Sequence, residues 1–291
     1  MPENKTVTID YDIEEIYNRV QKMFDDVDPE FGNLLREMNE IGYLDLAPSP
    51  NKSSGFAFTI YDYLNKMPFI FANVESIPRN VSDLSHEFGH CLAHYYAEMN
   101  LGLMSLGEMT QDLSEIPSKF NELLVHNYAE QFFGDKADCY IEDHLITFLT
   151  EIVVFCMYTE IENFLYTHVD ASFEERVAAV EEIKAVYNEG YDVKTGKYSK
   201  DGSWLLDNML VVTMPGYGIS YSFDNLATVY LASIYNNNKE EGVALYKKIC
   251  SLGRSYDYFS GMELVGMKPA FDEEAVKAVR EYFIKALKVE V

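Results

Sequence analysis

The segment His86-Glu87-Phe88-Gly89-His90 constrains this chain more than any other part of its sequence. On an α-helix, residues four positions apart share one face, so both imidazole rings can reach the same metal ion. Zinc is often held in this way together with a third protein ligand, and its fourth position carries a water that zinc makes acidic. Glu87 is the candidate base that activates this zinc-bound water. The segment therefore predicts the zinc-binding helix of a peptidase.

The residues around this segment favour a helix. Residues 81–85 offer serine and aspartate side chains that could cap it, and no proline follows within the apolar pattern that continues to Tyr96. Gly89 would cost a helix about 1 kcal/mol relative to alanine. We therefore expect a large group to approach the backbone at Gly89.

The third ligand is not a histidine of the same helix. A metzincin would have glycine at position 93 and histidine at position 96, where this chain has Ala93 and Tyr96. A glutamate from a second helix is the other common solution. Ala93 and Tyr96 therefore exclude the metzincin class, and the third ligand is sought in the segment that follows.

Residues 112–122 resemble the beginning of such a helix. Ser114 could cap it, and Pro117 would then lie in the first turn, where proline removes no hydrogen bond. Glu115 and Glu122 are seven positions apart and share one face. Either could bind the metal, and the other could support a ligand from behind.

These motifs together resemble the thimet oligopeptidase and oligoendopeptidase F family of zinc metallopeptidases. The resemblance rests on HEFGH followed by SEIPSKFNE, with 29 positions from His86 to Glu115, and extends over almost the whole chain. It implies that His86, His90 and Glu115 bind one zinc ion and that Glu87 is the general base. The implied activity is endopeptidase hydrolysis of oligopeptides or unfolded segments.

The resemblance also implies a fold and a domain organisation. We expect a mainly α zinc-peptidase catalytic domain with a small β-hairpin or sheet beside the zinc helix. Residues 1–291 would form this single domain, without the N-terminal half that family members usually have. A homo-oligomer or a second chain could then complete the cleft around a peptide substrate.

The segment Tyr217 to Thr228 resembles the tyrosine-rich segment of the family, which also has a histidine that stabilises the oxyanion. No histidine follows His168 in this chain. In one alignment Tyr217 and Tyr221 match family tyrosines, which makes them candidate catalytic residues, and Asp224 replaces the last tyrosine.

In a second alignment Gly216 replaces the histidine, and Ser222 and Asp224 replace tyrosines. Both alignments stay open, and so do two alternatives to a peptidase. One is a non-catalytic zinc-binding or peptide-binding protein derived from such an enzyme. The other is a structural zinc site closed by Glu122 as a fourth ligand.

Periodicity predicts helices through most of the chain and one hairpin. The strands are expected at Gly55 to Ile60 and Pro68 to Val74. The apolar run from Leu145 to Tyr158 is too short to span a bilayer and is expected to be a buried helix. The predicted helices are residues 11–41 with a break near Pro29, 81–100, 115–133, 137–168, 172–189, 202–212, 223–235, 238–253 and 272–288.

The remaining histidines and one cysteine receive simpler interpretations. His94 is expected behind the metal ligands or at the surface, and His126, four residues after Glu122, could hydrogen-bond to it. His144 shows no partner in the sequence. Cys91 would point away from the metal and pack in the core.

Composition indicates the setting. The formal net charge of −25 argues against nucleic acid and anionic membrane surfaces as partners. The four cysteines are scattered, and the N-terminus has no apolar signal core, so we expect a cytoplasmic protein.

Overall fold

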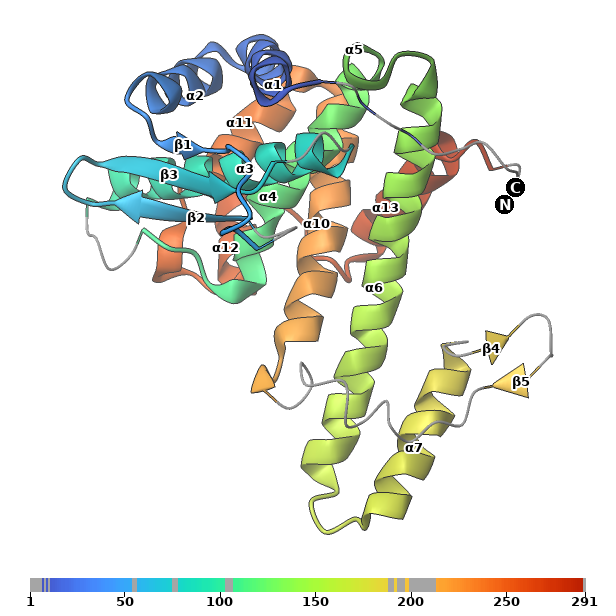
Figure 1. The fold of residues 1–291 in the computed structure, drawn as a ribbon. Coiled ribbons are helices and arrows are strands. Elements are labelled where there is room, and N and C mark those ends of the chain that lie inside the picture. Colours follow the sequence, from blue (N-terminus) through green and yellow to red (C-terminus); the bar gives the residue numbers. More distant parts are fainter. Residues whose placement is uncertain are drawn as a thin grey trace. The chain divides into compact units, whose positions relative to one another are not determined.

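The structure is a computed structural model that describes residues 7, 9, 11–53, 57–74, 78–102, 107–187, 191–192, 197–198 and 213–289. It is mainly α-helical with a small sheet, as predicted (Figure 1). The chain divides into two compact units, residues 1–145 with 224–291, and residues 146–223. The expectation of a single catalytic domain stays a prediction.

The predicted break near Pro29 is confirmed and has a clear local cause. Helix α1 (Ile13–Val27) ends at Asp28, and α2 (Pro29–Glu40) begins directly after it. The Asp28 carboxylate accepts a hydrogen bond of 2.8 Å from the backbone N–H of Glu30, while proline is favoured at the first helical position. One residue thus ends the first helix and caps the second.

The other predicted helices are also present, except that residues 202–212 lie outside the described part of the chain. The short helix at 258–265 was not predicted as a separate element. In chain order the remaining helices are α3 (Arg79–Leu101), α4 (Gln111–Leu124), η2 (Val125–Tyr128), α5 (Ala129–Phe133), η3 (Gly134–Lys136), α6 (Ala137–Thr167), α7 (Phe173–Val186), α10 (Tyr217–Asn237), α11 (Lys239–Cys250), η4 (Gly253–Ser255), α12 (Tyr258–Val265) and α13 (Glu273–Ala286).

The first unit contains a three-stranded sheet of β1 (Leu44–Asp45), β2 (Ala57–Asp62) and β3 (Met67–Ala72), in the order β1-β3-β2. Strands β2 and β3 form the predicted antiparallel hairpin, in which Thr59 is opposite Ile70. The parallel strand β1 was missed because two residues are too few to show alternation. The sheet packs on α3, and β2 is its outer strand on one side (Figure 1).

Helices α3 and α4 form the most extensive helix pair of the first unit. A Cβ atom at Gly89 would lie 2.4 Å from the Cα atom of Ser118 and 2.5 Å from the carbonyl oxygen of Pro117. The large group expected at Gly89 is therefore the backbone of α4. Helix α4 is also held by the buried Tyr246, whose hydroxyl lies 3.1 Å from the Pro117 carbonyl oxygen and 3.0 Å from Oδ1 of Asn121.

The predicted helix starts were wrong for both members of this pair. Helix α3 begins at Arg79 without a side-chain cap, so the serine and aspartate residues of 81–85 lie inside it. Helix α4 begins at Gln111, which places Ser114 and Pro117 inside the helix rather than at its start. Both helices bury residues near their first turns, Asn80 and Val81 in α3 and Leu113 in α4, so tertiary packing takes the place of side-chain caps.

The second unit contains most of α6 together with α7. Its core is formed by Met157, Ile161 and Val180, which are buried. Helix α7 begins with a capping box, in which the Ser172 hydroxyl accepts a hydrogen bond from the backbone of Glu175 and the Glu175 carboxylate accepts one from the backbone of Ser172.

The apolar run from Leu145 to Tyr158 is helical as predicted, but the prediction that it is buried holds only in part, for Leu145, Phe148 and Met157. Ile146, Leu149 and Val153 lie on one face and are 50%, 42% and 42% exposed. The continuous helical stretch from Gln111 to Thr167 is long and apolar enough to cross a membrane by length and composition alone. Core helices of other proteins pass the same test, so this stretch decides nothing about a membrane.

Candidate metal centre

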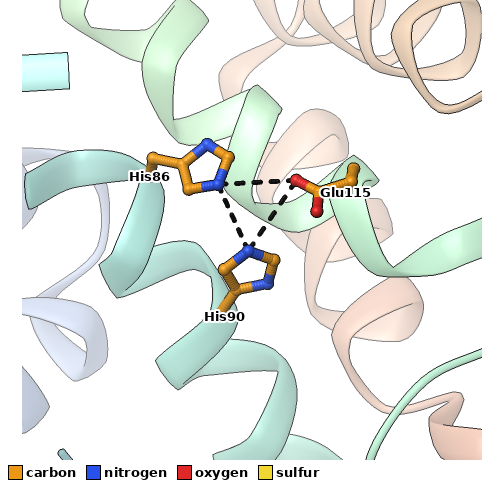
Figure 2. A group of neighbouring side chains, drawn as sticks. All are labelled: His86, His90 and Glu115. Carbon is orange, nitrogen blue, oxygen red and sulfur yellow. Dashed lines mark hydrogen bonds and ion pairs between the residues drawn. The ribbon is translucent and has the colours of Figure 1, made fainter. Parts of the chain in front are cut away.

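Three donor atoms from two helices meet in the first unit. His86 and His90 project from one face of α3, and Glu115 reaches them from α4 (Figure 2). The Nε2 atoms of His86 and His90 are 3.2 Å apart, and Oε2 of Glu115 lies 3.4 Å and 3.7 Å from them, respectively. A tetrahedral zinc ion with ligands at about 2.0–2.2 Å needs neighbouring donor atoms about 3.3–3.6 Å apart. The donor set and its spacing therefore fit zinc.

Glu122 lies behind His86 rather than beside the donor atoms. Its Oε1 atom is 2.6 Å from Nδ1 of His86, and its Oε2 atom is 2.8 Å from Nε2 of His144. A carboxylate only accepts, so the Nδ1–H of His86 donates and the Nε2 lone pair is left for the metal. Of the two glutamates that the sequence left open, Glu115 faces the metal position. The alternative of a structural site closed by Glu122 is not supported, because both of its oxygens are engaged elsewhere.

The pKa values of the two histidines are shifted in opposite directions. Burial alone would lower the pKa of His86, but the hydrogen bond and charge of Glu122 outweigh it and raise that pKa to about 9. For His90, burial prevails and lowers the pKa to about 4. Burial would raise the pKa of Glu115, yet the two histidines and the Ser118 hydroxyl bring it below its ordinary value. Near neutral pH the metal-free site thus has an ionised glutamate, one charged histidine and one neutral histidine.

Glu87 is buried between α3 and the sheet. The Thr59 hydroxyl lies 2.8 Å from Oε2 of Glu87 and 2.9 Å from its backbone carbonyl, so β2 orients the carboxylate. Burial raises the pKa of Glu87 above its ordinary value, although His86 and Thr59 oppose the shift. A carboxylate with a raised pKa is a better proton acceptor near neutrality. Thr59 had no signal in the sequence beyond its place in a predicted strand.

A pocket of about 210 Å³ opens beside His90 in the same unit. Its lining comes from α3, from the beginning of α4 and from the segment before α4. His94 is part of this lining and stacks on Tyr61 of β2 at 5.9 Å, which agrees with a place next to the metal ligands. The full lining is His90, Ala93, His94, Gly107, Glu108, Met109 and Ser114.

His126 and His144 extend the hydrogen bonds that begin at His86. Nε2 of His126 lies 2.8 Å from Nδ1 of His144, and it is His144 that contacts Glu122. The predicted direct bond from His126 to Glu122 was therefore wrong. His144 was missed because it is 22 positions from Glu122 and comes from another helix. Cys91 is buried as predicted, 3.8 Å from the Thr59 hydroxyl.

The tyrosine-rich segment divides between the two units. Tyr217 and Tyr221 lie in the second unit, where their hydroxyls are 2.8 Å apart, and their role at the metal centre stays a prediction. Ser222 is buried in the same unit, and its hydroxyl donates to the Ile152 carbonyl. Asp224 is fully buried in the first unit, and its Oδ2 atom accepts a hydrogen bond from the backbone N–H of Glu115. Asp224 thus supports the backbone of a donor residue.

Comparison with known proteins agrees with this fold. PZ peptidase A with an inhibitor superimposes with a TM-score of 0.82 at 23% identity, covering 98% of this chain and 50% of that one. A protein described as oligoendopeptidase F has a TM-score of 0.81 at 23% identity, with the same coverage. A Bacillus anthracis protein of the same description has a TM-score of 0.79 at 22% identity, covering 98% and 48%. At this identity the similarities establish the fold.

The chain spans about half the length of these solved structures. A search of curated proteins found no match. The model of peptidase family M3 matches residues 12–281, which is nearly the whole chain and includes every donor residue of the metal centre. The chain therefore belongs to peptidase family M3.

Proposed function

We propose that this chain is a zinc-dependent endopeptidase that hydrolyses peptide bonds in oligopeptides or unfolded segments. The observation that carries the proposal is the meeting of His86, His90 and Glu115 at the spacing that zinc requires. Zinc bound there would polarise a water molecule and the scissile carbonyl. Family membership supports peptide substrates.

The residues of the chain supply the remaining parts of such a reaction. Glu87 accepts a proton from the attacking water and returns it to the leaving amine, and the hydroxyl of Thr59 holds its carboxylate in place. Outer strand β2 offers main-chain hydrogen bonds to an extended peptide. The pocket beside His90 can receive one substrate side chain. Tyr217 and Tyr221 are proposed as hydroxyl donors to the substrate or oxyanion.

A quenched-fluorescence peptide library tests the proposal. The zinc-loaded protein should hydrolyse it, a chelator should abolish hydrolysis, and added zinc should restore it. Glu87→Gln should retain zinc and lose the activity, since an amide preserves the shape but cannot accept the proton. A base contributes about 10²–10⁴-fold, so residual activity above roughly 1% would refute the role of Glu87. Glu37→Gln, at an exposed position of α2, is the matched control.

One observation favours a second candidate, a non-catalytic zinc-binding or peptide-binding protein. In the second alignment Ser222 and Asp224 occupy tyrosine positions, and both side chains are buried and bonded to backbone groups. Neither offers a hydroxyl to a substrate, so the oxyanion would lose donors that commonly supply several kcal/mol. A protein that binds zinc and peptides but hydrolyses none of them would support this non-catalytic function. For either function, we propose a cytoplasmic location.

A further inference from the structure

A continuous line of hydrogen-bonding side chains runs from the metal centre into the first unit. It begins at Nδ1 of His86 on α3 and passes through both oxygens of Glu122 on α4, at 2.6 Å and 2.8 Å. It continues through both ring nitrogens of His144 on α6 and ends at His126 in η2, 2.8 Å beyond. Four polar groups from four elements are thus joined in series, and each of them is largely screened from solvent.

The chemistry of the four groups determines the direction of each hydrogen bond. The Glu122 carboxylate only accepts, so His86 must donate through Nδ1–H and His144 through Nε2–H. A neutral His144 then has a bare Nδ1 atom, which accepts from the Nε2–H of His126. This order leaves Nε2 of His86 without a proton when the metal binds, as metal ligation requires.

Aromatic packing holds the outer two rings in place. The Tyr140 ring stacks on His144 with centroids 5.6 Å apart, and it meets His126 edge-on at 6.0 Å. The Phe133 ring also stacks on Tyr140, with centroids 4.0 Å apart. The rings of His126 and His144 therefore have little freedom to turn away from Glu122.

We propose that His144 and His126 are positioning residues for the zinc site, acting on His86 through Glu122. They fix the orientation of the Glu122 carboxylate and thereby hold His86 with Nε2 toward the metal. The inference rests on the zinc binding of the proposed function and adds two residues outside the set of metal donors. Loss of a group that orients a metal ligand typically costs about 10–100-fold in affinity.

The zinc affinities of four variants, measured by competition with a chromophoric chelator, test this role. His144→Phe should weaken zinc binding by about 10-fold, the lower end for such groups, and His126→Phe by less, because it acts one bond farther away. His144→Gln should stay within about 3-fold of wild type, since its amide N–H can replace Nε2–H toward Glu122. His168→Phe, exposed just beyond the end of α6, is the matched control and should change nothing. Cobalt-substituted His144→Phe should also show altered visible absorption bands.

Nitrogen-15 NMR of the metal-free wild type gives a second readout that needs no variant to fold. Both His144 and His126 should carry a proton on Nε2. His144 protonated only on Nδ1 could not donate to Glu122, and this result would overturn the inference. So would unchanged zinc affinity in both phenylalanine variants, even if the wild type hydrolyses peptides. Conversely, a zinc-loaded wild type without hydrolysis would refute the peptidase proposal alone, and a wild type that takes up no zinc would refute both.

Discussion

Replacing Gly89 with alanine should destabilise the protein, although alanine is the better helix former. The added Cβ atom would lie 2.4 Å, 2.5 Å and 2.6 Å from three backbone atoms of Pro117 and Ser118. Carbon atoms in contact are normally about 3.5–4.0 Å apart, so α4 would have to retreat by about 1 Å. Overpacking costs about 1–3 kcal/mol, and we take the upper part of this range, about 2–3 kcal/mol, because the backbone of a packed helix cannot turn aside as a side chain can. Alanine regains about 1 kcal/mol of helix propensity, which leaves a net loss of about 1–2 kcal/mol.

The same retreat should weaken the metal site. Glu115 lies on α4 one turn before Ser118, so its Oε2 atom would move away from the histidines that it now approaches at 3.4 Å and 3.7 Å. We expect a zinc affinity about 10-fold lower, comparable with the loss of a group that orients a ligand. Stability and metal affinity should therefore fall together.

Two measurements check this prediction. Thermal unfolding of the metal-free variant should show a midpoint about 2–8 °C lower, since 1 kcal/mol corresponds to about 2–4 °C in a chain of roughly this size. Zinc titration should show the weaker binding. Met99→Ala, at a position of α3 that is 64% exposed, is the control and should stay within about 0.5 kcal/mol. A Gly89→Ala variant as stable as wild type would show that α3 and α4 tolerate a wider spacing, and the reasoning would fail.

Four further predictions concern the site itself. Glu115→Ala should lower zinc affinity far more than Glu122→Ala, because one removes a donor and the other only a group that orients His86; zinc titration of both variants would reveal the reverse order if Glu122 were the ligand. The pKa of His86 is raised to about 9, so zinc must displace a proton from it near neutral pH. The apparent zinc affinity should therefore rise about tenfold per pH unit from pH 7 to 9 and then level off. A flat profile would contradict the assignment of His86 as a metal ligand. The same raised pKa stabilises the metal-free fold below about pH 6.5, and this contribution should be lost as the pH rises through about 9, which thermal melts across this range would show. Thr59→Val removes a bond that lowers the pKa of Glu87, so the acidic limb of the kcat/KM profile should move to higher pH, while Thr59→Ser should leave it in place.

The features that the sequence predicted well are those set by short spacings. Two histidines four positions apart share a helical face wherever the helix lies, and Asp28 followed by Pro29 ends one helix and starts another within two residues. Spacing could not decide whether Glu115 or Glu122 is the metal ligand, because residues seven positions apart lie on the same face of a helix. That choice depends on how far α4 is shifted along α3, which is determined by tertiary packing.

The groups that surround the site come from distant parts of the chain, and this is why the sequence did not reveal them. Thr59 reaches Glu87 from a strand 28 positions earlier, and His144 reaches Glu122 from 22 positions later. The predicted caps of α3 and α4 failed for a related reason, because tertiary packing rather than a local cap supports the start of each helix. The exposed face of α6, with Ile146 and Val153, could not be predicted either. An apolar run indicates a helix or strand, but it does not reveal whether another element packs on it.

Because the three donor atoms are divided between α3 and α4, a metal ion bound there would cross-link the two helices. An ion held only by the folded chain shifts the unfolding equilibrium in proportion to the logarithm of its free concentration, by about 2.7 kcal/mol at 100 times its Kd. Any divalent ion that fits the two histidines and Glu115 would clamp the helix pair and raise the melting temperature. The order in which different metals raise that temperature would therefore reveal the selectivity of the site without any substrate. In a cell where zinc is scarce, the same coupling would make the lifetime of the folded chain a function of metal supply.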